Sequence, residues 1–490
     1  MNILSVTLAL LLLLLGLRTT SWHLQNWQLR EYRLDRMRAH LRTKDGRKNF
    51  SNLWFFKGIF PRPRKSGRMI MTLGVFLIIH IFFSLLGVEY FPQLLTLNSS
   101  LLIIFIWERT LFLTVFIAVF ITRIPVEVAR KILFLKAKRI VKNSNVVRIG
   151  ITGSFGKSST KQILIHLLQS KFGEENVLFN PGNENNEVAI ARLIIQNKSF
   201  FTGSVSQKGY GSKFMVAEIG AYRRGEIRGV CQFVQPHTGI ITGINAQHIE
   251  LFGSQRNIQR AKFELAESAT EKVFFNAESP LLREIAEDRD IDAVKIPLSI
   301  STAHNLTSDH HQSTFEIYRE KVTLPWSGSF FVSNALLAIE TAREYGMTPS
   351  EIANALPKLP RLDRALNIKT LANQSTLLED LYSANPDGVL GAIQHLGTFG
   401  GKKVFVGIPL RELGKEAEEV HRRIFVELEK MSAEVFWLKP DFSELGQVVC
   451  GSLFHGDDIE ELKKLLKTLT KNDAILLESR LPQAIVKLFQ

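Results

Sequence analysis

Cysteine is scarce in this 490-residue chain, which contains only Cys231 and Cys450. Two cysteines are too few for a disulfide framework or a cysteine-rich zinc site, so a reducing compartment is the default expectation. The chain is also too long for one small domain, because single cores usually stop growing at about 250–300 residues. We therefore expect two or three structural units.

Acidic residues are scarce in the two stretches that hold most of the net charge of +14. Residues 21–68 contain thirteen Lys or Arg and three acidic residues, and residues 123–142 contain seven Lys or Arg and one Glu. The rest of the chain is close to neutral. Basic stretches that flank apolar segments mark the cytoplasmic side of membrane proteins. This distribution argues against nucleic acid as a partner and favours a membrane bilayer.

Three apolar runs with few charges lie near the N-terminus, at 3–17, 69–88 and 101–122. The second and third are long enough, at about 1.5 Å per residue, to cross a hydrocarbon layer of about 30 Å. The first run could be a signal peptide, but no Lys or Arg precedes it, which favours an uncleaved anchor. We therefore expect residues 1–145 to be a membrane anchor with about three transmembrane helices.

The charges between these runs predict their orientation. The loop 88–100 has no Lys or Arg, as expected outside the cell, whereas the basic loop 21–68 is expected in the cytoplasm. This arrangement predicts a multi-pass protein of the cell inner (cytoplasmic) membrane with its catalytic domains in the cytosol.

Two features of the N-terminal region leave alternatives open. Glu108 and Arg109 lie inside the third apolar run, where they could contact a lipid headgroup or a partner helix, although local pairing is favoured. Apolar residues also recur at helical spacing among the arginines of the basic loop, at Trp27, Leu34, Met37 and Leu41. This spacing fits either a helix lying on an anionic membrane surface or a solvated linker.

A glycine loop follows a predicted buried strand at 146–152 and leads into a predicted helix at 160–168. The loop consists of Gly153, Ser154, Phe155, Gly156, Lys157, Ser158 and Ser159. A strand, a glycine loop and a helix start direct backbone N–H groups and the helix dipole at one anion. Lys157 can reach the outer phosphates of a nucleotide and Ser158 can bind Mg²⁺. The loop departs from GxxxxGK[ST] because Ile151 occupies the position of the first glycine.

Polar residues follow the next predicted strands. Glu218 ends the predicted strand 214–217, and a carboxylate at the carboxyl end of a strand in such a sheet is well placed for Mg²⁺. His248 and Lys262 follow the predicted strand 238–242 and are expected at the same edge of the sheet.

The order of these motifs resembles that of the Mur ligases, and most closely the MurF type. The resemblance covers about 146–490 and rests on separate blocks: ITGSFGKSSTK, NPGNENNEVA, AEIGAYRRGEI, NAQHIELFGS with AKFEL, GSFFVSNALLAIETA, EDLYSANPDG and VGIPLRELGKEAEEVH. It implies an α/β fold class, in which the N-terminal transmembrane helices are followed by two domains. These are a P-loop Mur ligase central ATP-binding domain at 146–361 and a C-terminal Rossmann-like domain at 362–490.

The resemblance also implies a reaction and its residues. Mur ligases use ATP and Mg²⁺ to convert a carboxylate into an acyl phosphate, which an amine then attacks to form an amide. The residues with an implied catalytic role are Lys157, Glu218, His248 and Lys262. Mg²⁺ ligands are implied at Ser158, Glu218, His248 and Lys262, the last as a carbamylated lysine. ATP contacts are implied at Gly153, Ser154, Gly156, Lys157, Ser158, Ser159, Asn334, Arg364 and Asp380. Substrate contacts are predicted for Asn183, Asn186, Tyr382 and Asn385.

Departures from the family pattern concern the substrate more than ATP. The family's N-terminal UDP-binding domain is absent, and the apolar helices take its place. Phe330 and Phe331 stand where the family usually has His and Asn, and Asp363 and Ser383 replace a Gly and an Asn. The sequence Leu477-Glu478-Ser479 replaces the family's Lys-Gly-Ser, near the incoming dipeptide.

We therefore expect a membrane-anchored, ATP-dependent acid–amino-acid ligase of cell-wall precursor synthesis, with MurF-like addition of a dipeptide as the leading reaction. Its predicted partners are the bilayer, a carboxylate-bearing cell-envelope precursor, an amino acid or dipeptide, and other envelope-synthesis proteins. One alternative is a Mur-type ligase acting on another envelope glycan, a lipid-linked acceptor or a polyglutamate-like acceptor. A non-catalytic ATP-binding scaffold is the other.

Overall fold

A computed structural model describes most of the chain: residues 3–42, 63–90, 97–182, 184–202, 213–245, 247–360, 366–381 and 385–489. Within these ranges the side chains of 3–15, 35, 39, 40, 42, 83–90 and 97–109 lie outside the description. The chain divides into two compact units, Met1–Leu133 and Phe134–Gln490.

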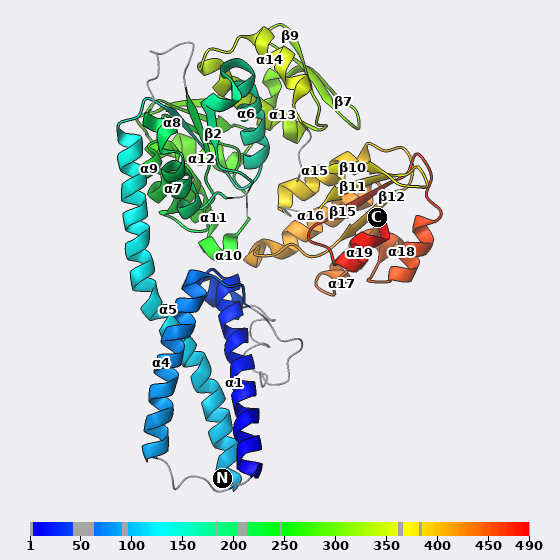
Figure 1. Cartoon of the computed structure of the whole chain (residues 1–490). Helices are drawn as coiled ribbons and strands as arrows, with labels where there is room; N and C mark the ends of the chain where they lie inside the picture. The colour runs from blue at the N-terminus through cyan, green and yellow to red at the C-terminus, as the bar shows by residue number, and fades with distance from the viewer. Residues whose placement is uncertain are drawn as a thin grey trace. The chain divides into compact units, whose positions relative to one another are not determined.

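The first unit is helical. Its helices are α1 (Ile3–Leu29), α2 (Leu34–Arg42), α4 (Gly67–Tyr90) and the first part of α5 (Leu97–Lys142), and α1, α4 and α5 run side by side (Figure 1). Their shared apolar core contains Leu24, Trp27, Met37, Phe76, Leu111, Val115, Ala118 and Val119.

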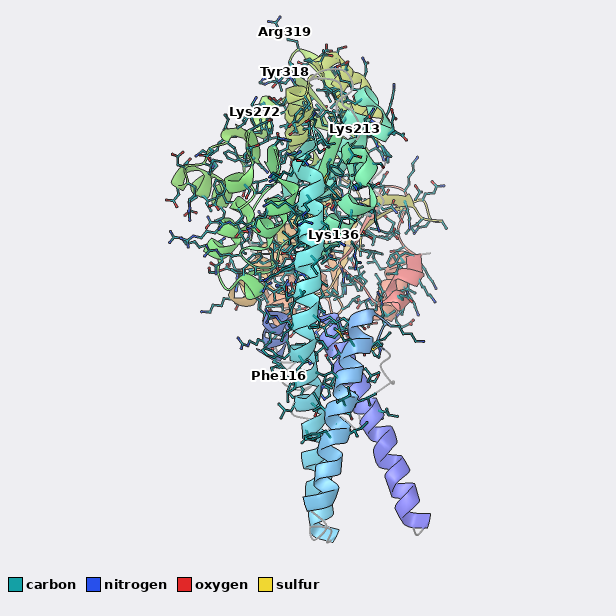
Figure 2. The ribbon with its side chains drawn as sticks, turned by 60° about the vertical axis from the view of Figure 1, so that its left-hand side comes forward. Phe116, Lys136, Lys213, Lys272, Tyr318 and Arg319 are labelled. Carbon is teal, nitrogen blue, oxygen red and sulfur yellow. The ribbon has the colours of Figure 1, made fainter. Side chains whose placement is uncertain are left out.

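This core changes the interpretation of the basic segment 21–68. The segment is helical at its start, through the end of α1 and through α2, rather than a loop. Trp27 and Met37 are buried among the helices, and the Trp27 ring packs 5.9 Å from that of Phe116, labelled in Figure 2. The periodic apolar residues therefore pack inside this unit rather than on a membrane surface or in a solvated linker.

The predicted multi-pass localisation in the cell inner membrane is wrong. In the part of the chain that the structure describes, one helical segment, Thr110–Lys142, is long and apolar enough to cross a bilayer, and Gly67–Phe82 is apolar but shorter. A multi-pass protein needs at least two such segments, and a single apolar helix of this kind also occurs in protein cores. The predicted partnership with a membrane bilayer is therefore not supported. The side chains of the first run and of Glu108 and Arg109 lie outside the described residues.

The second unit begins with a six-stranded parallel sheet in the order β2-β3-β1-β4-β5-β6. Its strands are β1 (Val147–Thr152), β2 (Val177–Phe179), β3 (Phe214–Glu218), β4 (Thr238–Ile241), β5 (Lys272–Asn276) and β6 (Val294–Leu298). The four inner strands β3, β1, β4 and β5 are largely buried, as expected when helices cover both faces. The strands predicted at 146–152, 214–217 and 238–242 are confirmed as β1, β3 and β4. Because the strands are parallel, the residues after β1, β3 and β4 meet at one edge.

Helices connect the strands of this sheet. They are α6 (Lys157–Phe172), α7 (Glu187–Gln196), α8 (Lys198–Thr202), α9 (Glu226–Val234), α10 (Ile249–Phe252), α11 (Gln255–Phe263) and α12 (Pro280–Asp288). The helices α13 (Ser329–Glu344) and α14 (Pro349–Ala355) follow. Helix α13 packs on α6 and β5 around a core that includes Leu164, Leu168, Val332 and Leu336. This packing fixes the start of α6, which carries the glycine loop.

A small antiparallel sheet joins this core. It contains β7 (His304–Ser308), β8 (Ser313–Ile317) and β9 (Glu320–Leu324). Tyr318 and Arg319 form the turn between β8 and β9, both with positive φ (Figure 2). Arg343 of α13 stacks on the Tyr318 ring at 3.5 Å, so this turn is attached to the helical layer.

A second six-stranded sheet forms the C-terminal part of this unit, in the order β10-β11-β15-β12-β13-β14. Its strands are β10 (Asn367–Thr370), β11 (Thr376–Asp380), β12 (Lys403–Gly407), β13 (Glu434–Trp437), β14 (Phe454–His455) and β15 (Ala474–Glu478). Only β10 is antiparallel to its neighbour. Helices α15 (Pro386–Gly397), α16 (Ala417–Lys430), α17 (Ser443–Cys450), α18 (Ile459–Leu466) and α19 (Gln483–Val486) complete it. Two separate apolar clusters cover its two faces, so the predicted α/β architecture with parallel sheets is confirmed.

Candidate active site

The glycine loop connects the carboxyl end of β1 to the amino end of α6. Gly153 and Gly156 have φ values of +153° and +76°, and a Cβ atom at these positions would clash with Thr242 and Asn334. Only glycine therefore fits at both positions without strain. The free N–H groups at the start of α6 face the loop, which makes this turn an anion-binding site.

Lys157 is the first residue of α6 and lies over the loop. Its Nζ donates to the carbonyl oxygens of Gly153 at 2.8 Å and Ser154 at 3.3 Å. Burial lowers the pKa of Lys157, and the nearby carboxylate of Glu218 opposes that shift. This ammonium group can reach the outer phosphates of a nucleotide held by the loop.

Glu218 is the centre of the polar network at this edge. It ends β3, is only 1% exposed, and its Oε2 accepts hydrogen bonds from Ser158 Oγ at 3.1 Å and Lys161 Nζ at 3.0 Å. Its Oε1 accepts from the Asn185 amide at 3.0 Å, and its backbone N–H donates to Asn180 at 2.8 Å. The predicted pair of Ser158 and Glu218 is therefore brought together by three further side chains.

The electrostatics of this network keep the carboxylate charged. Burial alone would raise the pKa of Glu218, but the charges of Lys161 and Lys157 and the hydrogen bonds from Asn185 and Lys161 outweigh it, so the pKa is lowered. An ionised carboxylate beside a serine hydroxyl is the oxygen set that Mg²⁺ takes when phosphates supply its other ligands. The residues present therefore fit one Mg²⁺ ion.

Three residues of this network were missed by sequence analysis: Lys161, Asn180 and Asn185. Lys161 also donates to the carbonyl oxygens of Asn180 and Gly182, which fixes the asparagine-rich loop beside α6. The signal was present, because Lys161 lies four residues after Lys157 and so on the same face of α6. The contact of Asn185 with Glu218 has no local signal, because the two residues lie more than thirty positions apart in the chain.

Lys262 occupies an apolar position on α11. Its side chain is 4% exposed, its Nζ lies 5.9 Å from the centre of the Phe252 ring, and it donates to the Ala221 carbonyl oxygen at 3.4 Å. Burial, reinforced by the charge of Lys157 and opposed by Glu226 and Glu264, lowers the pKa of Lys262 to about 7. The amine is therefore poised between its charged and neutral forms at neutral pH.

His248 begins α10 in a left-handed conformation, with φ of +62°. Its Nδ1 forms a hydrogen-bonded pair with Glu412, and its ring lies 4.9 Å from that of Tyr222. Burial lowers the pKa of His248, and Glu412 opposes that shift. Sequence analysis missed Glu412, which follows β12 in the C-terminal sheet and brings that part of the unit to His248.

The predicted second metal set pairs His248 with Lys262, and the charge of Lys262 contributes to the lowered pKa of His248, so the two groups lie near each other. Among the side chains that the structure describes, no group of three or more His, Cys, Asp or Glu residues converges as a metal site. His248 Nδ1 is engaged by Glu412, and an unmodified lysine side chain is an amine rather than a carboxylate-like ligand. The fit to a second ion therefore depends on modification of Lys262.

Asn334, which is predicted to contact ATP, lies beneath the glycine loop. Asn334 of α13 is 1% exposed, and its amide donates to Ser159 Oγ at 3.0 Å. The rings of Phe155 and Phe330 lie 5.7 Å apart, and Phe331 packs on Phe330 at 5.4 Å. Asn334 therefore supports the loop from below, and the phenylalanines form an apolar wall beside it.

Two predicted site residues belong to the C-terminal sheet and its first helix. Asp380 lies at the end of β11. Asn385 is the N-cap of α15, and its side chain accepts from Gly388 N–H at 3.0 Å. Asn245, which follows β4, donates to Asp387 in the first turn of α15. Asn186 caps α7 and accepts from Ala189 N–H at 3.0 Å. The other predicted contacts, Asn183, Arg364 and Tyr382, lie outside the described residues, as do Asp363 and Ser383.

Comparison with known proteins identifies the segment around this loop. Residues 151–342 match the family model described as the Mur ligase middle domain. This match covers the glycine loop, Glu218, His248, Lys262 and Asn334 within one Mur ligase middle domain.

Three relatives are each 27% identical to this chain, and the matched region covers only part of each protein. The UDP-N-acetylmuramoyl-tripeptide--D-alanyl-D-alanine ligase of Haemophilus influenzae is 27% identical over 298 residues, 59% of this chain and 62% of that protein. Proteins of the same name in Treponema pallidum and Escherichia coli are each 27% identical, over 66% and 56% of this chain and 69% and 60% of their own lengths. The chain thus spans less than two thirds of two of these three relatives.

Solved structures show the same fold. A crystal structure of MurF from Acinetobacter baumannii has a TM-score of 0.63 at 22% identity and covers 74% of this chain and 80% of that one. MurF ligase from Thermotoga maritima, in complex with ADP, has a TM-score of 0.61 at 22% identity and covers 74% and 83%. The Mur ligase middle domain and the C-terminal sheet therefore share the architecture of these ligases.

Proposed function

We propose that this chain is an ATP-dependent, ADP-forming ligase of the Mur type that joins a carboxylate to an amine in cell-wall precursor synthesis. The observation that carries the proposal is the ionised Glu218, which is held between Ser158 and Lys161 beside the glycine loop of a Mur ligase middle domain. A site that only bound ATP would not need a buried carboxylate fixed by four other side chains.

The proposed reaction has two steps. An oxygen of the acceptor carboxylate attacks the γ-phosphorus of ATP, which forms an acyl phosphate and releases ADP. The amine nitrogen then attacks the acyl carbon, which forms the amide, releases inorganic phosphate and frees a proton. Lys157 would neutralise the transferring phosphoryl group, and Ser158 and Glu218 would hold Mg²⁺ on the phosphates. Ser154, Ser159, Asn334, Arg364 and Asp380 are proposed to position ATP.

Lys262 is proposed to act as a carbamate. Its lowered pKa supports this role, because only the neutral amine reacts with carbon dioxide. The amine nitrogen bonds to the carbon of CO₂ and loses a proton, which converts a buried cation into a carboxylate-like group. With His248, this group would supply ligands for a second Mg²⁺.

The acceptor and the amine are proposed from the relatives. Three relatives are named for the addition of D-alanyl-D-alanine to a UDP-N-acetylmuramoyl tripeptide, and this MurF-like reaction is the leading candidate. We propose substrate contacts at Asn183, Asn186, Tyr382 and Asn385. We also propose the domain limits 1–145, 146–361 and 362–490.

A different envelope acceptor is the second candidate. The described residues before 143 lie mostly in the helices α1, α2, α4 and α5, where a MurF-type enzyme is expected to have its UDP-binding domain, and Glu478 stands where a glycine is expected. Both features favour an acceptor or an amine other than those of MurF, such as another envelope glycan or a polyglutamate-like polymer.

Phosphate release from ATP tests the proposal. The purified full-length chain is incubated with ATP, Mg²⁺, a panel of acceptor carboxylates and candidate amines, including UDP-N-acetylmuramoyl tripeptide with D-alanyl-D-alanine. We expect phosphate release that requires both an acceptor and an amine. Lys157→Ala should abolish it, whereas Lys321→Ala, at an exposed position of β9, should leave it unchanged. ATP binding without release for every pair would instead support a non-catalytic scaffold.

A further inference from the structure

Two carboxylates lie next to each other at the carboxyl edge of the C-terminal sheet. Asp380 ends β11 and Glu478 ends β15, and the two residues are partners in the parallel register of these neighbouring strands (Figure 1). Residues in register project to the same face of a sheet. Ser479 closes the edge, because its N–H donates to the Asp380 carbonyl oxygen at 2.9 Å.

Glu478 lacks the partners that a buried carboxylate needs. It is 1% exposed, and among the described residues its Oε1 accepts from Ser479 N–H at 3.1 Å, while its Oε2 has no hydrogen-bond partner there. The hydroxyl of Ser479 is also buried without a partner, and Ser479 has a positive φ of +72°. Such orphaned buried groups are rare in native proteins and indicate a missing ligand.

The described groups nearest to Glu478 are mainly acidic. Burial and the charge of Asp380 raise the pKa of Glu478 well above its usual range. Helix α15, which packs on β15, brings Asp387 to this end and His395 about 12 Å further along the helix. Lys403 of β12 is in register with Ala474, at the other end of β15. Among the described residues, no Lys or Arg forms an ion pair with Glu478.

We infer that Glu478, Ser479 and Asp380 form a subsite for an ammonium group of the incoming amine substrate, so that this substrate carries a second, non-reacting nitrogen. The inference rests on the proposed ligase function. An ammonium group has three N–H donors and no acceptor, which matches three oxygen acceptors. Two carboxylates that stabilise a cation would keep it protonated, and a protonated nitrogen cannot attack an acyl phosphate. The ammonium group in this subsite is therefore not the nucleophile.

The subsite is accessible through Asp380, which is only partly buried. Asp380 is also proposed to face the ribose of ATP, and a carboxylate has enough lone pairs to accept hydrogen bonds from both ligands. For Glu478, in contrast, no contact with ATP is proposed. A variant of Glu478 can therefore distinguish an effect on the amine substrate from an effect on ATP.

Matched amines test the subsite by turnover. Phosphate release is measured with lysine and norleucine, both enantiomers of each, because the two differ only in whether the side chain ends in an ammonium group. We expect kcat/KM to favour lysine by about 10- to 100-fold, mainly through KM. Glu478→Gln should remove this preference without changing the KM for ATP. Glu460→Gln, an exposed carboxylate of α18, is the matched control and should keep it.

Calorimetry tests the same subsite without turnover and without a variant. Lysine is titrated into the full-length chain with ADP and Mg²⁺ in two buffers of different ionisation enthalpy. A bound ammonium group favours the charged form of Glu478, so lysine binding should release up to one proton and should tighten as the pH rises. Norleucine should release none.

The outcomes separate the subsite from the ligase proposal. If no amine supports phosphate release, the ligase proposal fails, but proton release on lysine binding would still support the subsite. Equal binding of lysine and norleucine, or a lysine preference that survives Glu478→Gln, would overturn the subsite. A changed KM for ATP with an unchanged amine preference would also overturn it, because it would assign Glu478 to the nucleotide.

Discussion

Lys262 combines a buried amine with a cationic neighbour, and its pKa of about 7 makes the site sensitive to pH. The pKa is lowered from 10.5, so the neutral amine prevails above about pH 7 and the ammonium form below it. Only the neutral amine can form a carbamate. We therefore predict that kcat/KM for phosphate release falls about tenfold per pH unit below 7 and that added bicarbonate restores part of the loss.

Variants at Lys262 check this explanation. Lys262→Arg keeps a positive charge at all accessible pH values and should lose activity throughout. Lys321→Arg, at an exposed position, should retain the wild-type pH profile. Full activity of Lys262→Arg, or a flat profile below pH 7 in the wild type, would contradict the carbamate.

Asn185 is proposed to act on Mg²⁺ through Glu218, since its amide fixes Oε1 while Oε2 accepts from Ser158. Removing such a supporting hydrogen bond typically weakens metal binding by about 10- to 100-fold. We predict that Asn185→Ala raises the Mg²⁺ concentration needed for half-maximal phosphate release by about tenfold, with a smaller change in kcat at saturating Mg²⁺. Asn305→Ala, at an exposed asparagine of β7 whose amide also donates to a carboxylate, is the control. An unchanged Mg²⁺ requirement in Asn185→Ala would contradict this role.

At the scale of elements, α6 and β3 are joined by a buried ion pair. Lys161 and Glu218 are 8% and 1% exposed at the side chain and 3.0 Å apart. Loss of one partner leaves a buried charge with less compensation, which costs about 3 kcal/mol. We predict that Lys161→Met lowers the free energy of unfolding by about this amount in urea denaturation. Lys463→Met, which removes an exposed pair with Glu460, should change it by less than about 0.5 kcal/mol.

Helix α14 begins with a capping box. Thr348 accepts from Glu351 N–H at 3.3 Å, and Glu351 accepts from Thr348 N–H at 2.7 Å. Loss of an N-cap hydroxyl costs about 1 kcal/mol. Thr348→Ala should therefore destabilise the second unit by about 1 kcal/mol in the same urea titration, and Thr348→Ser should be close to wild type. Equal stability of the two variants would show that the cap contributes nothing here.

The elements also show which parts of the site could be predicted from the sequence. Strands β1, β3 and β4 were predictable because each is a short buried apolar run followed by a polar residue, and parallel pairing then brings Ser158 and Glu218 together. The pairings of Glu218 with Asn185 and of His248 with Glu412 were not predictable, because they join residues 33 and 164 positions apart. The missing signal is spatial: Asn185 follows β2, which pairs with β3, and Glu412 follows β12 of the other sheet.

At the scale of the whole molecule, the N-terminal helices show that an apolar run does not by itself identify a transmembrane helix. An apolar run satisfies the same length criterion whether it crosses a bilayer or packs against other helices. Here Trp27, Leu111 and Val115 are buried in the core of the first unit, and one segment of the described chain meets the criterion for a span. The family resemblance of the second unit was more informative, because it rested on the order of several motifs rather than on composition.

The central claim is that the chain forms an acyl phosphate, and isotope transfer tests it most directly. The acceptor carboxylate is labelled with ¹⁸O, and the phosphate released during turnover with ATP and the amine is analysed by mass spectrometry. Because a carboxylate oxygen bonds to the γ-phosphorus and leaves with it, we predict one ¹⁸O atom in each phosphate released. Amide formation with unlabelled phosphate, or phosphate release that needs no acceptor, would contradict the mechanism.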